Sequence, residues 1–111
     1  MADERIIRIA ELEIVPARLA EYLAFLREEI AASIAREPGV VMLHAVSEKT
    51  DPHKIRILEV YASQAAYEAH IQTPHFLKYK QGTADMVANL RLVDMNAVIL
   101  AAQSPISNSI S

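Results

Sequence analysis

The chain has 111 residues, of which 52% are hydrophobic and 23% are charged. This length suits one domain, and a chain of this size buries roughly two-thirds of its unfolded surface, so we expect a single packed core. The absence of cysteine excludes disulfides, thiol catalysis and thiolate metal sites. A net charge of −3 without any basic run argues against a nucleic-acid partner.

Glycine content and hydropathy exclude further classes of protein. Glycine occurs only at Gly39 and Gly82, so neither a glycine-rich phosphate loop nor a dinucleotide fingerprint can be built. No apolar run approaches the roughly 18 residues that span a membrane, and the charged start at 1–5 is unlike a secretory signal. We therefore expect a cytoplasmic protein without a membrane partner. Residues 1–101 should form the domain, and 102–111 a serine-rich tail that is flexible or lies over a partner.

The first 46 residues predict a strand, a long helix and a second strand. Residues 5–15 are β-branched and alternate, which is typical of a half-buried strand. Pro16 then suits the first turn of a helix. An apolar stripe at helical spacing follows and consists of Leu19, Leu23, Leu26, Ile30 and Ile34. The helix should end at Glu37-Pro38-Gly39, where Gly39 can adopt a positive φ. Residues 40–46 form the next predicted strand.

The second half predicts a third strand over 54–61, reached through a turn at Asp51-Pro52. Ser63 is a candidate N-cap for a short helix over 64–72, which the Thr73-Pro74 pair should interrupt. Helical spacing resumes from about His75 to Asn89, and 92–100 is predicted as the last strand. The order β-α-β-β-α-β is the ferredoxin-like arrangement of an α+β domain.

The third strand also predicts self-association. Ile55 and Ile57 point to one face of the sheet, while Leu58 and Val60 point to the other. A sheet that is apolar on both faces needs a second covering layer, and a second copy of the chain can supply it. We therefore predict a homodimer packed sheet to sheet.

Three histidines are candidates for chemistry, because histidine titrates near neutral pH. His44 shares a strand face with Met42 and Val46, so it is either a core or dimer-facing residue or a polar group of a ligand pocket. His70 and His75 lie on either side of Thr73-Pro74, and such a break can aim both imidazoles into one cavity. A structural role and a catalytic or substrate-orienting role both stay open for this pair. The spacing of five without a suitably placed carboxylate disfavours a metal, and we predict no metal site.

Glu59 lies on an otherwise apolar strand face, which is costly for a carboxylate without a partner. It could pair with His70, His75 or Arg91, and a histidine partner would make an oriented base, whereas arginine would make an ordinary ion pair. Aromatic residues lie near these groups along the chain, either in the core or around a small-ligand pocket. The candidate pocket residues are Tyr61, Tyr67, Phe76 and Tyr79.

Together these motifs resemble the antibiotic biosynthesis monooxygenase domain family, and its quinol monooxygenase-like branch above all. The resemblance covers residues 5 to about 100 and rests on motifs in a fixed order. These are Glu37-Pro38-Gly39, Asp51-Pro52, Glu59-Val60-Tyr61 and the run from Glu68 to Phe76 with its His-Xaa4-His-Phe segment. It implies a dimeric α/β barrel, in agreement with the dimer expected from the strand faces.

The resemblance implies oxidation of a small quinol-like or polyphenolic aromatic by dioxygen, without a cofactor. His70 or His75 would be the base, Glu59 its orienting partner, and Tyr61, Phe76 and Tyr79 the walls around the ring. Haem degradation is disfavoured because the chain has no tryptophan. Two alternatives stay open: a non-catalytic small-ligand dimer, and an isomerase of a phosphorylated signalling sugar. The isomerase would need a cationic site, for which the candidates are Arg56, Arg91 and Lys80.

Overall fold

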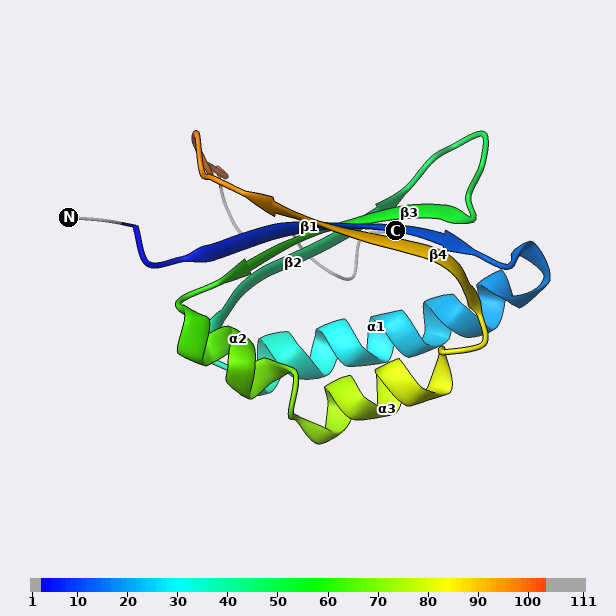
Figure 1. Cartoon of the computed structure of the whole chain (residues 1–111), viewed down its shortest axis with the longest axis horizontal. Helices are drawn as coiled ribbons and strands as arrows, with labels where there is room; N and C mark the ends of the chain where they lie inside the picture. The colour runs from blue at the N-terminus through cyan, green and yellow to red at the C-terminus, as the bar shows by residue number, and fades with distance from the viewer. Residues whose placement is uncertain (1–2, 104–111) are drawn as a thin grey trace.

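One antiparallel sheet carries three helices on a single face (Figure 1). The computed structural model describes residues 3–103. Its elements are β1 (Ile6–Ile14), a 3-10 turn (Pro16–Arg18), α1 (Leu19–Arg36), β2 (Val40–Ser47), β3 (Lys54–Tyr61), α2 (Gln64–His70), α3 (Pro74–Gly82) and β4 (Val87–Met95). The strand order β2-β3-β1-β4 places β1 and β3 at the centre. This is the predicted ferredoxin-like α+β fold, with its second helical segment divided between α2 and α3.

The strand register decides which side chains face the helices. Across β1 and β3, Arg8 pairs with Glu59, Ala10 with Ile57 and Leu12 with Ile55, and directly paired residues share one face. Ala10 and Leu12 are buried against α1, so this is the inner face of the sheet. Ile7, Ile9 and the residues paired with them point to the opposite, outer face.

Helix α1 buries a line of residues beside the predicted apolar stripe. Its buried residues are Tyr22, Leu26, Glu29 and Ser33, and only Leu26 belongs to the predicted set. Leu19, Leu23 and Ile30 pack at the margin of the core, whereas Ile34 is 46% exposed. The inward line therefore begins with apolar side chains and ends with polar ones. None of the helices in residues 3–103 combines the length and apolar character needed to cross a membrane.

The end of the chain departs from the prediction. A helix expected to reach Asn89 ends at Gly82, and the last strand runs over Val87–Met95 in place of 92–100. Gly82 lies so close to the Phe25 ring that a side chain at this position would collide with it. Beyond it, β4 pairs with β1 from Ile14↔Val87 onwards. The cross-strand pairing thus overrides the apparent helical spacing of this segment.

Gly39 serves a different purpose from the predicted one. No glycine among the described residues has a positive φ. A Cβ at Gly39 would instead lie 2.6 Å from the Cβ of Ala66, so α2 approaches the start of β2 too closely for a larger residue. Ala62 N also donates a hydrogen bond to Gly39 O at 2.8 Å. Gly39 thereby fixes where α2, and His70 at its end, can lie.

Candidate active site

A cavity of about 460 Å³ lies between the inner face of the sheet and the helices. Its walls are mostly aliphatic and aromatic, as is usual for a small-molecule site. Six residues predicted from the sequence line it: Glu59, Tyr61, Tyr67, His70, Phe76 and Tyr79. Lys80, a candidate cation of the isomerase alternative, also lines the cavity. Two further ionisable lining residues, Arg8 and Glu29, were not predicted as site groups.

Two helix caps hold the histidines in place. Ser63 Oγ accepts a hydrogen bond from Ala66 N at 3.1 Å and begins α2, as predicted. Thr73 Oγ1 accepts from Phe76 N at 3.2 Å and donates to His70 O at 2.8 Å. One threonine thus joins the end of α2 to the start of α3. This junction sets His70 and His75 beside each other, with ring centroids 6.4 Å apart.

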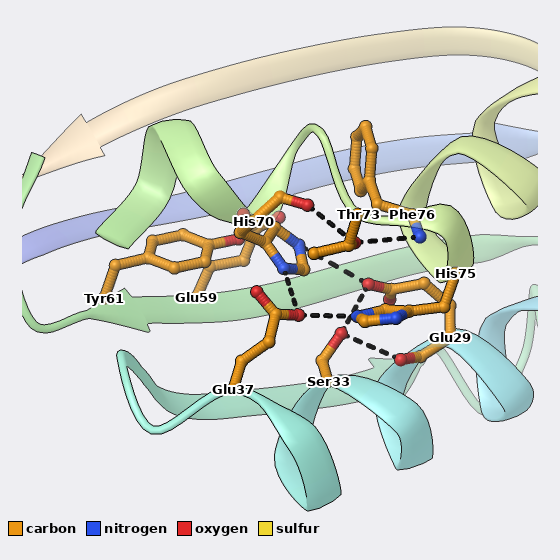
Figure 2. Close-up of polar contacts among 9 residues, drawn as sticks. All are labelled: Glu29, Ser33, Glu37, Glu59, Tyr61, His70, Thr73, His75 and Phe76. Atoms are coloured by element: carbon orange, nitrogen blue, oxygen red, sulfur yellow. Dashed lines mark hydrogen bonds and ion pairs between the residues drawn. The ribbon is translucent and has the colours of Figure 1, made fainter. Parts of the chain in front are cut away.

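The two imidazoles converge on a carboxylate, as Figure 2 shows. His70 Nδ1 lies 3.0 Å from Glu37 Oε2, and His75 Nε2 lies 2.6 Å from the same oxygen. The other nitrogen of His70, Nε2, is 3.4 Å from Glu29 Oε1. Ser33 Oγ in turn donates to Glu29 Oε1 at 2.8 Å. His70 is only 2% exposed, so every one of these contacts at its ring is made away from water.

The structure does not bring all the predicted residues to the cavity. His44 pairs with Leu58 and therefore faces the outer side of the sheet, while its neighbour Leu43 lines the cavity. His75 reaches Glu37 but is not among the lining residues. Glu59 accepts a hydrogen bond from the Tyr61 hydroxyl at 2.8 Å. Among the described residues no histidine is hydrogen-bonded to Glu59, because His70 and His75 bond to Glu37 instead.

Besides Arg8, the sequence reasoning missed three polar residues that contact one another or the histidines: Glu29, Ser33 and Glu37. A signal for them exists in the sequence. Tyr22 and Leu26 begin a line that continues through these three residues at successive steps of four, three, four and four, which is one face of a helix. Searching for apolar residues alone finds the parallel stripe and overlooks this one. Polar residues that continue the spacing of a buried helix face are the signal that points to these three.

Burial and hydrogen bonding move the pKa values of the three glutamates in different directions. Burial raises the pKa of Glu29, against the hydrogen bond from Ser33. Burial likewise raises the pKa of Glu59, although the Tyr61 hydrogen bond opposes it. Burial also acts on Glu37, but the hydrogen bonds from His75 and His70 outweigh it and lower the pKa of Glu37. The site therefore holds one carboxyl group with a lowered pKa beside two carboxyl groups with raised pKa values.

Aromatic and cationic side chains complete the cavity wall. The Tyr22 and Tyr79 hydroxyl oxygens are 2.6 Å apart, and burial raises the pKa of Tyr22 to about 12. Arg8 places its guanidinium 4.5 Å from the centroid of the Tyr67 ring and donates to Asp94 Oδ1 at 3.0 Å. Tyr79 lines the cavity whereas the fully buried Tyr22 does not, so Tyr79 is the member of this pair that can contact a bound ring.

Glu37, His70 and His75 also offer three potential metal-ligand atoms within 4.8 Å of one another. Zinc ligands at about 2.0–2.1 Å in tetrahedral geometry would be separated by roughly 3.3 Å. The 2.6 Å between His75 Nε2 and Glu37 Oε2 is instead the length of a charge-assisted hydrogen bond. The observed arrangement is that of a hydrogen-bonded chain.

A sequence model described as antibiotic biosynthesis monooxygenase matches residues 5–82. The chain belongs to this family. A solved structure from Bacteroides thetaiotaomicron, named provisionally as a family monooxygenase, is 48% identical with a TM-score of 0.89. The match covers 95% of this chain and 100% of that one. A similarly named structure from Caulobacter crescentus is 26% identical with a TM-score of 0.80, over 87% of this chain and 92% of that one.

Among curated proteins, an uncharacterized protein of Synechocystis sp. is 26% identical over 87 residues. The aligned region covers 78% of this chain but only 58% of that protein. The chain therefore spans little more than half the length of this relative. The fold is shared with the two solved structures, and the reaction has to be argued from the site itself.

Proposed function

We propose that this family member is a cofactor-independent monooxygenase acting on a small quinol-like or polyphenolic aromatic. One observation carries the proposal: a largely apolar cavity of about 460 Å³ has the buried imidazole of His70 in its wall. Such a cavity can hold an aromatic ring away from water and place a base beside its hydroxyl group. The size and the mostly aliphatic and aromatic lining suit one small ring system.

The reaction can be written with the substrate as the only electron donor. Removal of the hydroxyl proton of a phenol gives a phenolate, which passes one electron to dioxygen and forms superoxide and a phenoxyl radical. Their combination makes a carbon–oxygen bond, and a returned proton gives a ring hydroperoxide at a carbon that still bears hydrogen. Loss of that hydrogen with cleavage of the oxygen–oxygen bond leaves a carbonyl and releases water. One oxygen atom enters the product, the other becomes water, and four electrons come from the substrate.

His70 is the proposed base, since of the two paired histidines it is the one that lines the cavity. His75 acts through Glu37 as a positioning residue. Glu59 stays in the proposal as a cavity carboxyl held by Tyr61, beside the guanidinium of Arg8. The ring would lie among Tyr67, Phe76 and Tyr79, whose side chains form the aromatic part of the lining.

Oxygen uptake tests this function. Metal-stripped protein is mixed with a panel of naphthohydroquinones, and the autoxidation rate is subtracted. We expect enzyme-dependent uptake that falls by about 10²-fold or more in His70→Ala, the range expected for loss of a general base. His53→Ala is the matched control, because His53 lies between β2 and β3 and does not line the cavity. Uptake at the autoxidation rate across the panel, or full turnover in a folded His70→Ala variant, would contradict the proposal.

A second function, isomerisation of a phosphorylated sugar, has one observation in its favour. Of its three candidate cations, Lys80 lines the cavity together with Arg8. Two carboxyl groups, Glu29 and Glu59, share the same wall and would repel a phosphate when ionised. A thermal-shift titration decides between the classes. Stabilisation by a phosphorylated ketose that disappears in Lys80→Ala would favour the isomerase.

The outer face of the sheet supports a homodimer as part of the same proposal. All three helices lie on the other face (Figure 1), while Val46 and Met95 are 65% and 41% exposed. Two such sheets packed face to face would make the dimeric α/β barrel. Sedimentation at micromolar concentration tests this. A dimer that dissociates in Val46→Glu is expected, and a monomeric wild-type chain would rule the dimer out.

A further inference from the structure

Four ionisable side chains make an unbroken line of contacts that leads away from the cavity (Figure 2). It runs from Glu29 to His70 at 3.4 Å, from His70 to Glu37 at 3.0 Å and from Glu37 to His75 at 2.6 Å. Glu29 and His70 line the cavity, whereas Glu37 and His75 do not. The side chains at the far end are 13% and 9% exposed, compared with 3% for His70. The line therefore starts at the cavity wall, where the Glu29 side chain is 7% exposed, and ends at two side chains that are slightly more exposed.

We propose that Glu29, His70, Glu37 and His75 form one proton-transfer chain between the cavity and the protein surface. The proposal rests on the monooxygenase function and identifies the groups that serve its proton step. Glu29 and His70 together receive the proton from the substrate hydroxyl, which leaves the substrate as a phenolate. One proton leaves the other end of the chain at His75, so the number of protons in the protein is unchanged.

A proton shared at the cavity end would allow both ring nitrogens of His70 to be hydrogen-bonded. Both of its ring nitrogens face carboxyl oxygens, but a neutral imidazole has only one N–H to donate. If both contacts carry hydrogen bonds, either the ring is doubly protonated or a carboxyl group donates to it, and in both cases one extra proton resides here. The Ser33 hydroxyl lies 2.9 Å from Glu29 O and 2.8 Å from Glu29 Oε1, with a single hydrogen for two acceptors. A proton on Glu29 would let both contacts be hydrogen bonds.

The surroundings keep that proton within the chain. Charged or titratable groups also face His70 from the sheet, namely Glu59 and Tyr61 on β3 and Arg8 on β1. Tyr61 donates its hydroxyl hydrogen to Glu59, and Arg8 pairs with Glu59 across the strands. Each of the three therefore has a partner outside the chain of four, which for the Arg8 guanidinium is Asp94. Within the chain, burial raises the pKa of Glu29, while the imidazoles lower the pKa of Glu37. These directions agree with a proton held at the cavity end and a negative charge on Glu37, the carboxylate that both rings contact.

Nuclear magnetic resonance of the protein without substrate tests the chain independently of any activity. The carbon-bound ring protons of His70 are followed as a function of pH in the wild type and in Glu29→Gln. The Glu29 carboxylate stabilises a proton shared with the His70 ring, and glutamine removes that carboxylate. The pH at which Glu29 and His70 lose their last shared proton should therefore exceed, by about one unit or more, the pH at which His70 alone loses it in Glu29→Gln. The His53 resonance serves as an internal control. An unchanged His70 midpoint would overturn the shared proton.

Oxygen uptake then tests whether the chain carries protons during turnover. His75→Ala should slow uptake by roughly tenfold or more, and millimolar imidazole should restore most of the loss, because the vacated position is near the surface. Glu37→Gln, which keeps the shape of the side chain, should lose activity that imidazole does not restore. Full uptake in both variants, with the His70 midpoint behaving as expected, would make the chain structural and overturn the proposal. A wild type without uptake refutes the function, while the resonance experiment still decides the shared proton.

Discussion

The two halves of α1 face the same sheet but bury opposite kinds of side chain. The first half places Tyr22 and Leu26 against apolar strand residues, in one contiguous core cluster. The second half places Glu29 and Ser33 inward, and the turn after the helix adds Glu37. Both stretches follow one helical face. The first half holds the helix to the sheet through burial of apolar surface, and the second half holds three helices together through hydrogen bonds.

The difference shows how a small domain can keep polar chemistry in its interior. No buried side-chain nitrogen or oxygen in the described part of the chain lacks a hydrogen-bond partner. Glu29 and Ser33 bond to each other within α1, and Glu37 bonds to His70 of α2 and His75 of α3. Such a network is costly to break at any one member, because the remaining groups stay buried without partners. The apolar half should therefore respond to lost volume, and the polar half to lost hydrogen bonds and to pH.

Leu26→Ala should give the largest effect on stability. Leu26 is 4% exposed within the core cluster, and truncation of a buried leucine costs about 2–5 kcal/mol. Urea denaturation measures this change in the free energy of unfolding. Tyr22→Phe is the matched control in the same half, and it removes only the hydroxyl contact with Tyr79, worth about 0.5–1.5 kcal/mol. A Leu26→Ala loss no greater than the Tyr22→Phe loss would contradict the division of the helix.

In the polar half, Glu29→Gln and Glu37→Gln should change the pH dependence of stability in opposite directions. The pKa of Glu29 is raised above 4.5 by burial, so its favourable contribution is complete below pH 4.5 and is lost as pH rises through the folded pKa. The pKa of Glu37 is lowered below 4.5, so its contribution is present above pH 4.5 and is lost as pH falls through the folded pKa. Glu37→Gln should weaken the protein at pH 7 and flatten its acid sensitivity, whereas Glu29→Gln should flatten the loss on the alkaline side.

Urea denaturation from pH 3.5 to 8 measures both slopes, and Glu48→Gln controls for a glutamate that faces solvent. Glu48 pairs with Arg56 at 2.8 Å on the surface, and a glutamine there should leave the alkaline slope unchanged. Parallel changes in Glu29→Gln and Glu37→Gln would contradict the assignment of opposite protonation preferences. The division of α1 into an apolar and a polar half would then reduce to a difference in composition.

The same division explains what could be predicted from the sequence. Periodicity and turn residues predicted the strands of the first half and the Thr73-Pro74 break, because those patterns depend on neighbours along the chain. Glu37 was used as a helix end and as part of a family motif but was given no role in the site, since its partners His70 and His75 are more than 30 residues away. The end of α3 and the start of β4 were wrong for a similar reason. The pairing with β1 that decides them is not visible in the local sequence.

Thr73→Ala sharpens the comparison within the polar half. Loss of this N-cap should cost about 1 kcal/mol, and it also removes the bond from Thr73 Oγ1 to His70 O that joins α2 to α3. Ser63→Ala removes a cap of the same kind at the other end of α2, where no histidine is held. We expect similar losses of stability in the two variants but a larger loss of oxygen uptake in Thr73→Ala. Equal uptake in both would mean that the threonine does not position the histidines.

Lys78→Ala should give the smallest effect, and that small effect tests what holds α3 against α1. Lys78 Nζ lies 2.6 Å from Glu28 Oε1, but the two side chains are 60% and 55% exposed, and exposed pairs of this kind contribute about 0–1 kcal/mol. The same two helices meet beneath this pair through Tyr79 and Tyr22, whose hydroxyls are in contact. If buried contacts join the helices, Lys78→Ala should change the free energy of unfolding by less than about 0.5 kcal/mol. The size of that change should not depend on salt concentration. The opposite outcome is a larger loss of unfolding free energy in Lys78→Ala, with a similar loss in the wild type at high salt. The surface ion pair would then hold the two helices together, and the buried line from Tyr22 to Glu37 would serve the cavity alone.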